Sequence, residues 1–205
     1  MARGSRPAAA LLALGFGLVT VAVLVRDPLP GEVRTLRAVH VEDEGWRRLL
    51  EAVSDATDLG PLVLVAAVGL GVLVAARRRS DAVLLVAVCA VVWAINPVIK
   101  DLVARPRPDL WSLPAGVSEH AFPSGHAANT AALVGAALAV LAVGLSGRAR
   151  VVALGVGAMV LLVVAGAQLA LGRHWPSDVL AGWLWAGACL AVVLSVRARR
   201  PAGRH

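Results

Sequence analysis

The stretch Phe122-Pro123-Ser124-Gly125-His126 marks a sharp change in the character of the chain. Before it, residues 111–120 mix polar, charged and apolar side chains in a pattern typical of a loop. After it, residues 127–145 contain no charged side chain. A Ser-Gly pair at the start of a helix offers free backbone N–H groups and a small surface to an anion, and histidine titrates near neutral pH. The stretch therefore predicts a phosphate-binding turn where a membrane-spanning helix begins.

The composition is that of a membrane protein. The chain has 205 residues, of which 59% are hydrophobic, whereas soluble domains are about 45–50% apolar. The net charge is +7, but the basic residues lie between apolar runs and at the chain ends, which suits lipid headgroups better than nucleic acid. Cys89 and Cys189 lie inside apolar runs without metal-ligand spacing, and we interpret them as small core residues.

Six apolar runs predict an all-α fold, an integral membrane bundle of six transmembrane helices in a single domain over residues 1–205. About 20 apolar residues cross a hydrocarbon core of roughly 30 Å as a helix, and lipid offers no partner to unpaired backbone groups. The first run could also be a signal peptide, but its length and the lack of a small-residue cleavage site favour an uncleaved span. The predicted spans are about residues 8–25, 61–76, 82–103, 127–145, 151–171 and 179–196.

The first long polar segment, residues 26–60, contains an amphipathic pattern. Its apolar residues recur at helical spacing with charged residues between them; they are Trp46, Leu49, Leu50 and Val53. The pattern predicts a short amphipathic helix in the first outer loop that lies on the bilayer. A helix that caps the bundle without touching lipid fits the pattern equally well.

The distribution of arginine predicts the orientation. With an even number of spans both termini share a side, and cytoplasmic loops carry an excess of basic residues. That side collects Arg3, Arg6, Arg77, Arg78, Arg79, Arg148, Arg150, Arg197, Arg199, Arg200 and Arg204. The opposite side receives residues 26–60, 104–125 and 172–178, and the last two hold the residues that suit chemistry. We therefore expect a cell-membrane protein with cytoplasmic termini and an active site on the outer face.

Two cationic residues flank the end of the third predicted span. Lys100 is the only lysine in the chain, and Arg107 follows seven residues later, before Pro108. An ammonium beside a guanidinium suits an anion such as phosphate. The alternative is that these side chains simply extend to the headgroups, as basic residues at span ends often do.

His174 and Asp178 form a second pair, at the start of the sixth predicted span. Residues at positions i and i+4 share a helix face, so the carboxylate can reach the imidazole. A carboxylate bound to one ring nitrogen fixes the tautomer and leaves the lone pair of the other nitrogen free. A helix-capping aspartate beside an interfacial histidine is the alternative.

Taken together and in this order, the motifs Lys-x6-Arg-Pro (100–108), Pro-Ser-Gly-His (123–126) and His-x3-Asp (174–178) resemble the type 2 phosphatidic acid phosphatase (PAP2) family. The resemblance covers residues 100–178 and the six-span layout of its membrane-bound members. It implies that His174 is the nucleophile that takes the phosphoryl group, that Asp178 orients it, and that His126 is the general acid. It implies phosphate binding by Lys100, Arg107, the Ser124 hydroxyl and the Gly125 N–H group.

The function that follows is a metal-independent lipid phosphate phosphatase with a phosphohistidine intermediate. The substrate would be a phosphomonoester or diphosphate of a membrane lipid, such as phosphatidate, phosphatidylglycerophosphate or a polyprenyl diphosphate. No cofactor and no metal are expected, since these motifs include no carboxylate cluster, and no nucleic-acid partner is expected. The alternatives are a lipid phosphotransferase of the same fold and a non-catalytic lipid-binding or transport protein.

One position departs from the family pattern. The third signature usually begins Ser-Arg, with the arginine six residues before the histidine, and here Ala167 and Gln168 occupy those positions. A charged hydrogen bond contributes about 1.5–3 kcal/mol, against about 0.5–1.5 kcal/mol for a neutral one. We therefore expect a weaker phosphate site, unless Arg173 supplies the missing charge.

Overall fold

The computed structural model describes residues 2–113, 118–142 and 144–199, with side chains from residue 6 onward. In these ranges the chain is helical and forms no sheet, which confirms the all-α prediction; one isolated bridge pairs Pro106 with His120. The helices are α1 (Ala2–Val25), α2 (Glu32–Val39), α3 (Glu44–Ala56), α4 (Leu59–Ala75), α5 (Arg79–Val103), α6 (Gly125–Leu141), α7 (Gly147–Ala170) and α8 (Pro176–Arg197).

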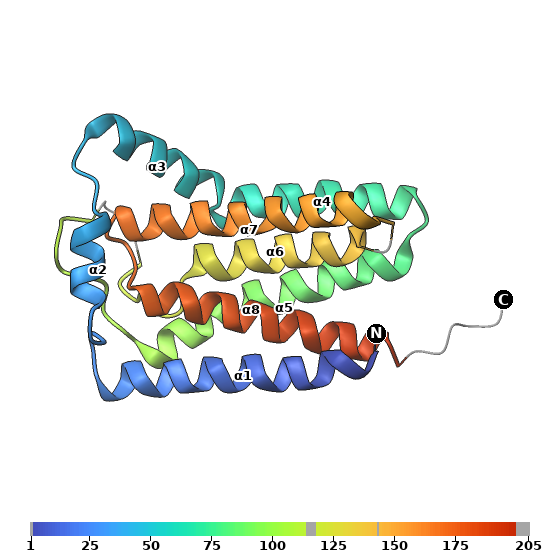
Figure 1. Cartoon of the computed structure of the whole chain (residues 1–205), viewed down its shortest axis with the longest axis horizontal. Coiled ribbons are helices and arrows are strands. Elements are labelled where there is room, and N and C mark those ends of the chain that lie inside the picture. Colours follow the sequence, from blue (N-terminus) through green and yellow to red (C-terminus); the bar gives the residue numbers. More distant parts are fainter. Residues whose placement is uncertain (1, 114–117, 143, 200–205) are drawn as a thin grey trace.

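The long helices run side by side in a bundle, with α2 across one end and α3 leaning away from it (Figure 1). Helix α6 packs against α5, α7 and α8, and α1 lies along α8. Small residues four positions apart, Ala128, Ala132 and Ala136, are buried on α6 and face large apolar residues of α5 such as Leu84 and Val88. Helices with alanine at the contact can approach closely, as in other membrane bundles.

Polar residues fix the start of three helices. Ser124 precedes α6, and its hydroxyl accepts a hydrogen bond from the Ala127 N–H at 3.4 Å. Asp43 precedes α3 and accepts from the Trp46 N–H at 3.0 Å. At the start of α8 the Asp178 carboxylate accepts from the Trp175 N–H at 2.8 Å. Such caps satisfy N–H groups that have no partner within the helix.

The described residues contain four or five candidate membrane spans. Four helices are long and apolar enough to cross a bilayer, and a fifth span results if α3 and α4, bent by 50°, are taken together. Helices α4 and α6 have 17 residues each, about 26 Å of helix, short of a core of roughly 30 Å. Each of the six predicted segments contains a helix, so the protein is a multi-pass membrane protein, but a count of six spans is not confirmed. The predicted span 127–145 extends past the end of α6 at Leu141, and residue 143 lies outside the described residues.

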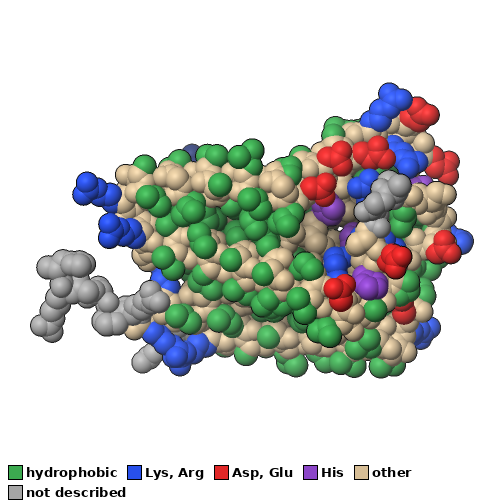
Figure 2. Space-filling view, turned by 180° about the vertical axis from the view of Figure 1, so that it is seen from behind, with side chains coloured by type: hydrophobic (Ala, Val, Ile, Leu, Met, Phe, Trp, Pro, Cys, Tyr) green, Lys and Arg blue, Asp and Glu red, His purple; other side chains and the backbone are tan. Residues whose placement is uncertain are grey.

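The two ends of the bundle differ in charge. The N-terminus and the end of α8 lie at the same end (Figure 1). Figure 2 shows acidic and histidine side chains gathered at the opposite end, with hydrophobic side chains between the two ends. At the end that holds the termini, Asp81 is paired with Arg78 and Arg197, each at 2.6 Å, which ties α5 to α8.

The amphipathic helix predicted in the first loop is α3, and it packs against α7. Ser54 is buried at this contact, while Trp46 and Leu49 remain 63% and 53% exposed. Helix α3 therefore covers part of the bundle and keeps an apolar strip on its outer side.

Candidate active site

A cavity of about 440 Å³ lies among the residues where α5 ends and α6 begins. Its lining comes from the α3–α4 junction, the end of α5, the loop before α6, the start of α6, the end of α7 and the segment between α7 and α8. Five of the seven predicted site residues line it: Lys100, Arg107, Gly125, His126 and His174. The three motifs, far apart in sequence, therefore meet at one cavity.

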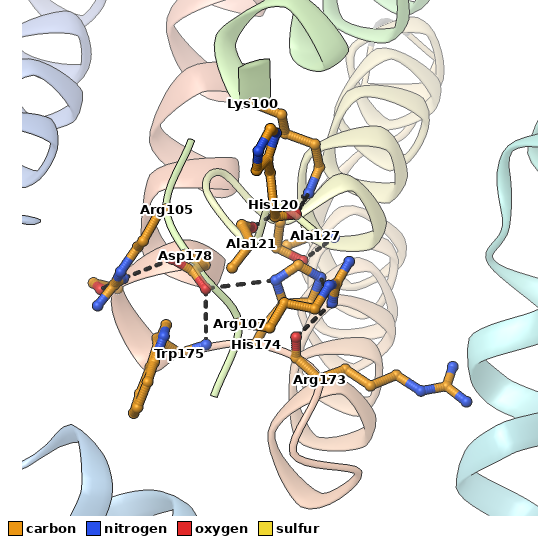
Figure 3. A network of polar contacts seen from close by, with 12 residues as sticks. Lys100, Arg105, Arg107, His120, Ala121, Ala127, Arg173, His174, Trp175 and Asp178 are labelled. Carbon is orange, nitrogen blue, oxygen red and sulfur yellow. Dashed lines mark hydrogen bonds and ion pairs between the residues drawn. The ribbon is translucent and has the colours of Figure 1, made fainter. Parts of the chain in front are cut away.

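His174 is buried, with 1% of its surface exposed, and both ring nitrogens face identified groups. Its Nε2 lies 3.3 Å from Nη1 of Arg107. Since a guanidinium can only donate, Nε2 is the accepting nitrogen and the ring proton is on Nδ1. Nδ1 lies 3.5 Å from Oδ2 of Asp178, the contact drawn between the two residues in Figure 3, slightly beyond an ordinary hydrogen bond.

The surroundings of His174 keep its ring neutral. Burial, followed by the positive charges of Arg107 and Lys100, lowers the pKa of His174 well below its ordinary value. A neutral imidazole has a free lone pair, and here that lone pair is on the nitrogen that faces the cavity cations. The ring is thus in the form required of a nucleophile.

Asp178 is fixed by a buried cation that sequence reasoning missed. Nη1 of Arg105 donates to Oδ1 of Asp178 at 2.6 Å, and its Nη2 donates to Glu32 and Asp27 at 2.7 Å each. Glu32 in turn accepts from the backbone N–H and the hydroxyl of Ser177. Although burial opposes the charge, these carboxylates raise the pKa of Arg105 above its ordinary value. The network joins the first loop to the start of α8.

The two predicted phosphate-binding cations contact loop carbonyl groups. Nζ of Lys100 donates to the carbonyl oxygens of His120 at 2.8 Å and Ala121 at 3.3 Å, and an ammonium has a third N–H group to offer. Arg107 donates to the backbone carbonyls of Ser118 and Arg173. Burial lowers the pKa of Arg107 to about 10, with Asp178 opposing this and Arg173 adding to it, so its charge persists at neutral pH.

Gly125 and Ser124 have different surroundings. Gly125 lines the cavity, and a Cβ atom there would lie 3.7 Å from Nδ2 of Asn96 and 3.9 Å from Cε of Lys100. Ser124 is fully buried and does not line the cavity; its hydroxyl caps α6 through Ala127. The role of Ser124 in phosphate binding therefore stays a prediction.

His126 contacts the first loop, which sequence reasoning had not linked to the site. Its Nε2 lies 2.9 Å from Oδ1 of Asp58 and 3.2 Å from Oγ of Ser54. The same Oγ accepts hydrogen bonds from Nε2 of Gln168 at 3.0 Å and from Nη1 of Arg173 at 2.7 Å. Asp58 precedes α4 as its N-cap, so the one available signal was an aspartate at a helix start on the predicted outer side.

The described residues contain no candidate metal centre. Within residues 2–113, 118–142 and 144–199, no three His, Cys, Asp or Glu side chains lie together so that they could hold a metal ion.

Comparisons with known proteins agree with the motifs. The sequence profile of the PAP2 superfamily matches residues 80–202. Decaprenylphosphoryl-5-phosphoribose phosphatases from two strains of Mycobacterium tuberculosis are 37% identical over 140 residues, 66% of this chain and 72% of theirs.

The fold also has a solved counterpart. A transmembrane PAP2 type phosphatidylglycerolphosphate phosphatase from Bacillus subtilis superposes with a TM-score of 0.81 at 20% identity, over 96% of this chain and 99% of that one. At this identity the match shows the fold alone. With the profile match and the curated relatives, it places the chain in the PAP2 superfamily, as a multi-pass membrane phosphatase that hydrolyses phosphoric esters.

Proposed function

We propose that the protein is a lipid phosphate phosphatase that works through a phosphohistidine on His174. The observation that carries this proposal is that Nε2 of His174, the ring of His126 and the cations Lys100 and Arg107 all border one cavity. Phosphoryl transfer depends mainly on positioning and on neutralising charge, and this cavity offers both.

The proposed reaction has two balanced steps. The Nε2 lone pair of His174 forms a bond to phosphorus, while the bond to the leaving oxygen breaks and its electron pair passes to that oxygen. His126 gives the oxygen a proton, and Asp178 stabilises the positive charge that develops on His174. Water then attacks phosphorus, gives a proton to His126, and the electron pair of the P–N bond returns to His174.

Lys100, Arg107 and the Gly125 N–H group would bind the phosphate oxygens, with Ser124 as a further predicted donor. Arg173 would supply the charge that Gln168 lacks, because its guanidinium and the Gln168 amide bind the same Ser54 hydroxyl. The reaction would need no metal. If Arg173 has this role, Arg173→Ala should lower kcat/KM and Gln168→Arg should raise it; an unchanged rate in Arg173→Ala removes Arg173 from the site.

For the lipid, we propose a polyprenyl-linked phosphosugar. The curated relatives are named for decaprenylphosphoryl-5-phosphoribose. In this chain the cavity lining includes the uncharged polar side chains of Ser118 and Asn129, which can exchange hydrogen bonds with the hydroxyl groups of a sugar. Phosphatidate, phosphatidylglycerophosphate and polyprenyl diphosphate are the other candidate substrates.

The proposed topology is a single domain over residues 1–205 with six spans, both termini in the cytoplasm and the cavity on the outer face of the cell membrane. Figure 2 shows basic side chains without acidic ones at one end of the bundle, and the start of α1 and the end of α8 lie at that end (Figure 1), which supports this orientation. The short helices α4 and α6 would span by locally thinning the bilayer.

Phosphate release from these four lipid classes, measured with purified protein in detergent and with EDTA present, tests the proposal. The wild type should release phosphate from at least one, and fastest from the phosphosugar lipid. His174→Ala should lower kcat by about 1,000-fold or more, since it removes the nucleophile, and should lose the phosphoenzyme trapped by rapid acid quench. Activity that survives in His174→Ala, or that EDTA abolishes, would contradict the proposed mechanism.

A further inference from the structure

His126 forms an ion pair with Asp58, the residue that precedes α4, which lies outside the three sequence motifs. Oδ1 of Asp58 lies 2.9 Å from Nε2 of His126. We propose that Asp58 is a positioning residue for the acid–base step, which holds the imidazolium form of His126 and selects the ring nitrogen that exchanges a proton with the substrate. The inference rests on the proposed function, in which His126 is the general acid.

The geometry assigns a different task to each nitrogen of the ring. Nε2 is the nitrogen in the ion pair with Asp58, and because a carboxylate offers only acceptor atoms, this contact favours a proton on Nε2. Ser54 is the second group near this nitrogen, at 3.2 Å. Nδ1 makes no hydrogen bond to the described residues and is therefore the nitrogen left for the leaving oxygen. The pair formed by His174 and Asp178 has the opposite arrangement, because there the carboxylate faces Nδ1.

The charges around the cavity explain why His126 needs this partner. Lys100, Arg107 and Arg173 all line the cavity. Their positive charges disfavour a further positive charge nearby, on the imidazole of His126. The acidic residues on the lining are Asp58 and Asp55, and only Asp58 has an ion pair with the ring among the described contacts. An opposite charge within about 4–6 Å favours the charged form of a group, so Asp58 acts on His126 in the direction opposite to these cations.

Asp58 then works in both halves of the reaction. In the first, the Nδ1 proton of His126 passes to the leaving oxygen as that oxygen takes the electron pair of the P–O bond. The ring becomes neutral and keeps its Nε2 proton, which faces the Asp58 carboxylate, so the lone pair of the neutral ring is on Nδ1. In the second, Nδ1 takes a proton from the attacking water. Asp58 remains a carboxylate throughout.

The test compares two leaving groups in wild type, Asp58→Asn and Asp55→Asn. Dioctanoyl phosphatidate has an alkyl leaving group, which needs a proton as it departs; p-nitrophenyl phosphate has an aryl leaving group, which departs as a stable anion. A positioned acid contributes about 10²–10⁴-fold to a rate. Asp58→Asn should therefore lower kcat/KM for the alkyl substrate by about 10- to 100-fold, and for the aryl substrate by less than about threefold.

Two further readouts separate positioning from general damage. Asp58→Asn should move the alkaline limb of the kcat/KM profile to lower pH, because an unpaired His126 loses its proton more easily, and Asp58→Glu should restore part of the shift. Asp55→Asn removes the same charge from the same cavity lining and should keep the alkyl-to-aryl ratio of the wild type. This ratio does not depend on the fraction of folded protein.

Equal losses on both substrates in Asp58→Asn, or an unmoved alkaline limb, would overturn the inference while leaving the proposed phosphatase intact. A change of ratio as large in Asp55→Asn would also overturn it, since any nearby charge would then suffice. A wild-type protein that hydrolyses neither substrate nor the lipid panel would instead overturn the proposed function, and this inference with it.

Discussion

Arg105 shows how much one residue can do for a site that it does not line. Arg105 is 3% exposed, and its guanidinium pairs with three carboxylates, Asp27 and Glu32 in the first loop and Asp178 at the start of α8. The face of Trp175 lies 5.4 Å from its Cζ. Because Asp178 faces His174, the position of the nucleophile depends on a cation two contacts away.

Arg105→Met should therefore lower the stability of the folded protein. The change leaves the buried carboxylates of Asp178 and Glu32 without their cation, and breaking a buried pair in this way costs about 3–5 kcal/mol. Thermal unfolding in detergent measures the loss. Arg107→Met is the control, since Arg107 borders the cavity: it should abolish most activity with a much smaller loss of stability. Equal stability losses would contradict the assignment.

The depressed pKa of His174 has a consequence for stability at acid pH. Above about pH 6.5 the ring is neutral in both the folded and the unfolded chain, so its protonation does not change the free energy of unfolding there. Below that pH the unfolded chain takes up a proton that the folded site excludes, because burial and then Arg107 and Lys100 lower the pKa of His174. Acid therefore favours unfolding through this residue.

Thermal unfolding of His174→Asn at pH 7.5 and at pH 5 measures this effect. The variant should lose less stability between the two pH values than the wild type does, since it has no group to protonate. His40→Asn, in the first loop, is the control for a general loss of histidine. A wild type and a His174→Asn variant with the same pH dependence would contradict the argument.

Among the helices, the contact between α6 and α8 brings the motifs together. Gly182 of α8 lies against the start of α6: a Cβ atom there would be 2.9 Å from the carbonyl oxygen of Ser124 and 3.0 Å from the N atom of Ala128. The backbone N–H of Ser124 also donates to the carbonyl oxygen of Asp178 at 3.0 Å. Any side chain at position 182 would push the two histidine-bearing segments apart.

Gly182→Ala should accordingly lower both stability, by about 1–3 kcal/mol for overpacking, and phosphate release. Gly166→Ala in α7 is the matched control, since a Cβ atom there meets nothing within 4 Å. It should be neutral or stabilising by up to about 1 kcal/mol. Both variants can be compared by thermal unfolding and phosphate release in detergent. A tolerated Gly182→Ala would show that the contact between α6 and α8 adjusts without cost.

At the scale of the whole molecule, the proposed orientation can be tested with single cysteines. Glu42, between α2 and α3, and Ser146, just before α7, are both exposed. The connection from α2 to α3 and the start of α7 lie toward opposite ends of the bundle (Figure 1), and the native Cys89 and Cys189 are buried. In intact cells a membrane-impermeant maleimide should label Glu42→Cys and not Ser146→Cys, and both should react after the cells are opened. The reverse labelling would place the cavity on the cytoplasmic side.

The sequence alone determined the features that depend on neighbouring residues. A long apolar run in a membrane becomes a helix because lipid offers its backbone no hydrogen-bond partner, and each of the six predicted segments contains a helix. Short motifs at helix starts place their polar groups locally, so Gly125 and His126 begin α6 as the motif indicates. The motifs all lie at predicted span ends on one side of the membrane, so the sequence alone also predicted that they meet at a single site.

Only the tertiary structure decided which distant residues complete the site. Arg105 pairs with Asp178 across 73 positions, and Ser54 contacts His126 across 72. Such pairs depend on how the first loop folds over the bundle, which no local pattern encodes. The same packing brings Arg173 and Gln168 to the Ser54 hydroxyl, and it places Asp58 beside His126. Helix packing, and not spacing along the chain, sets these distances between charged groups.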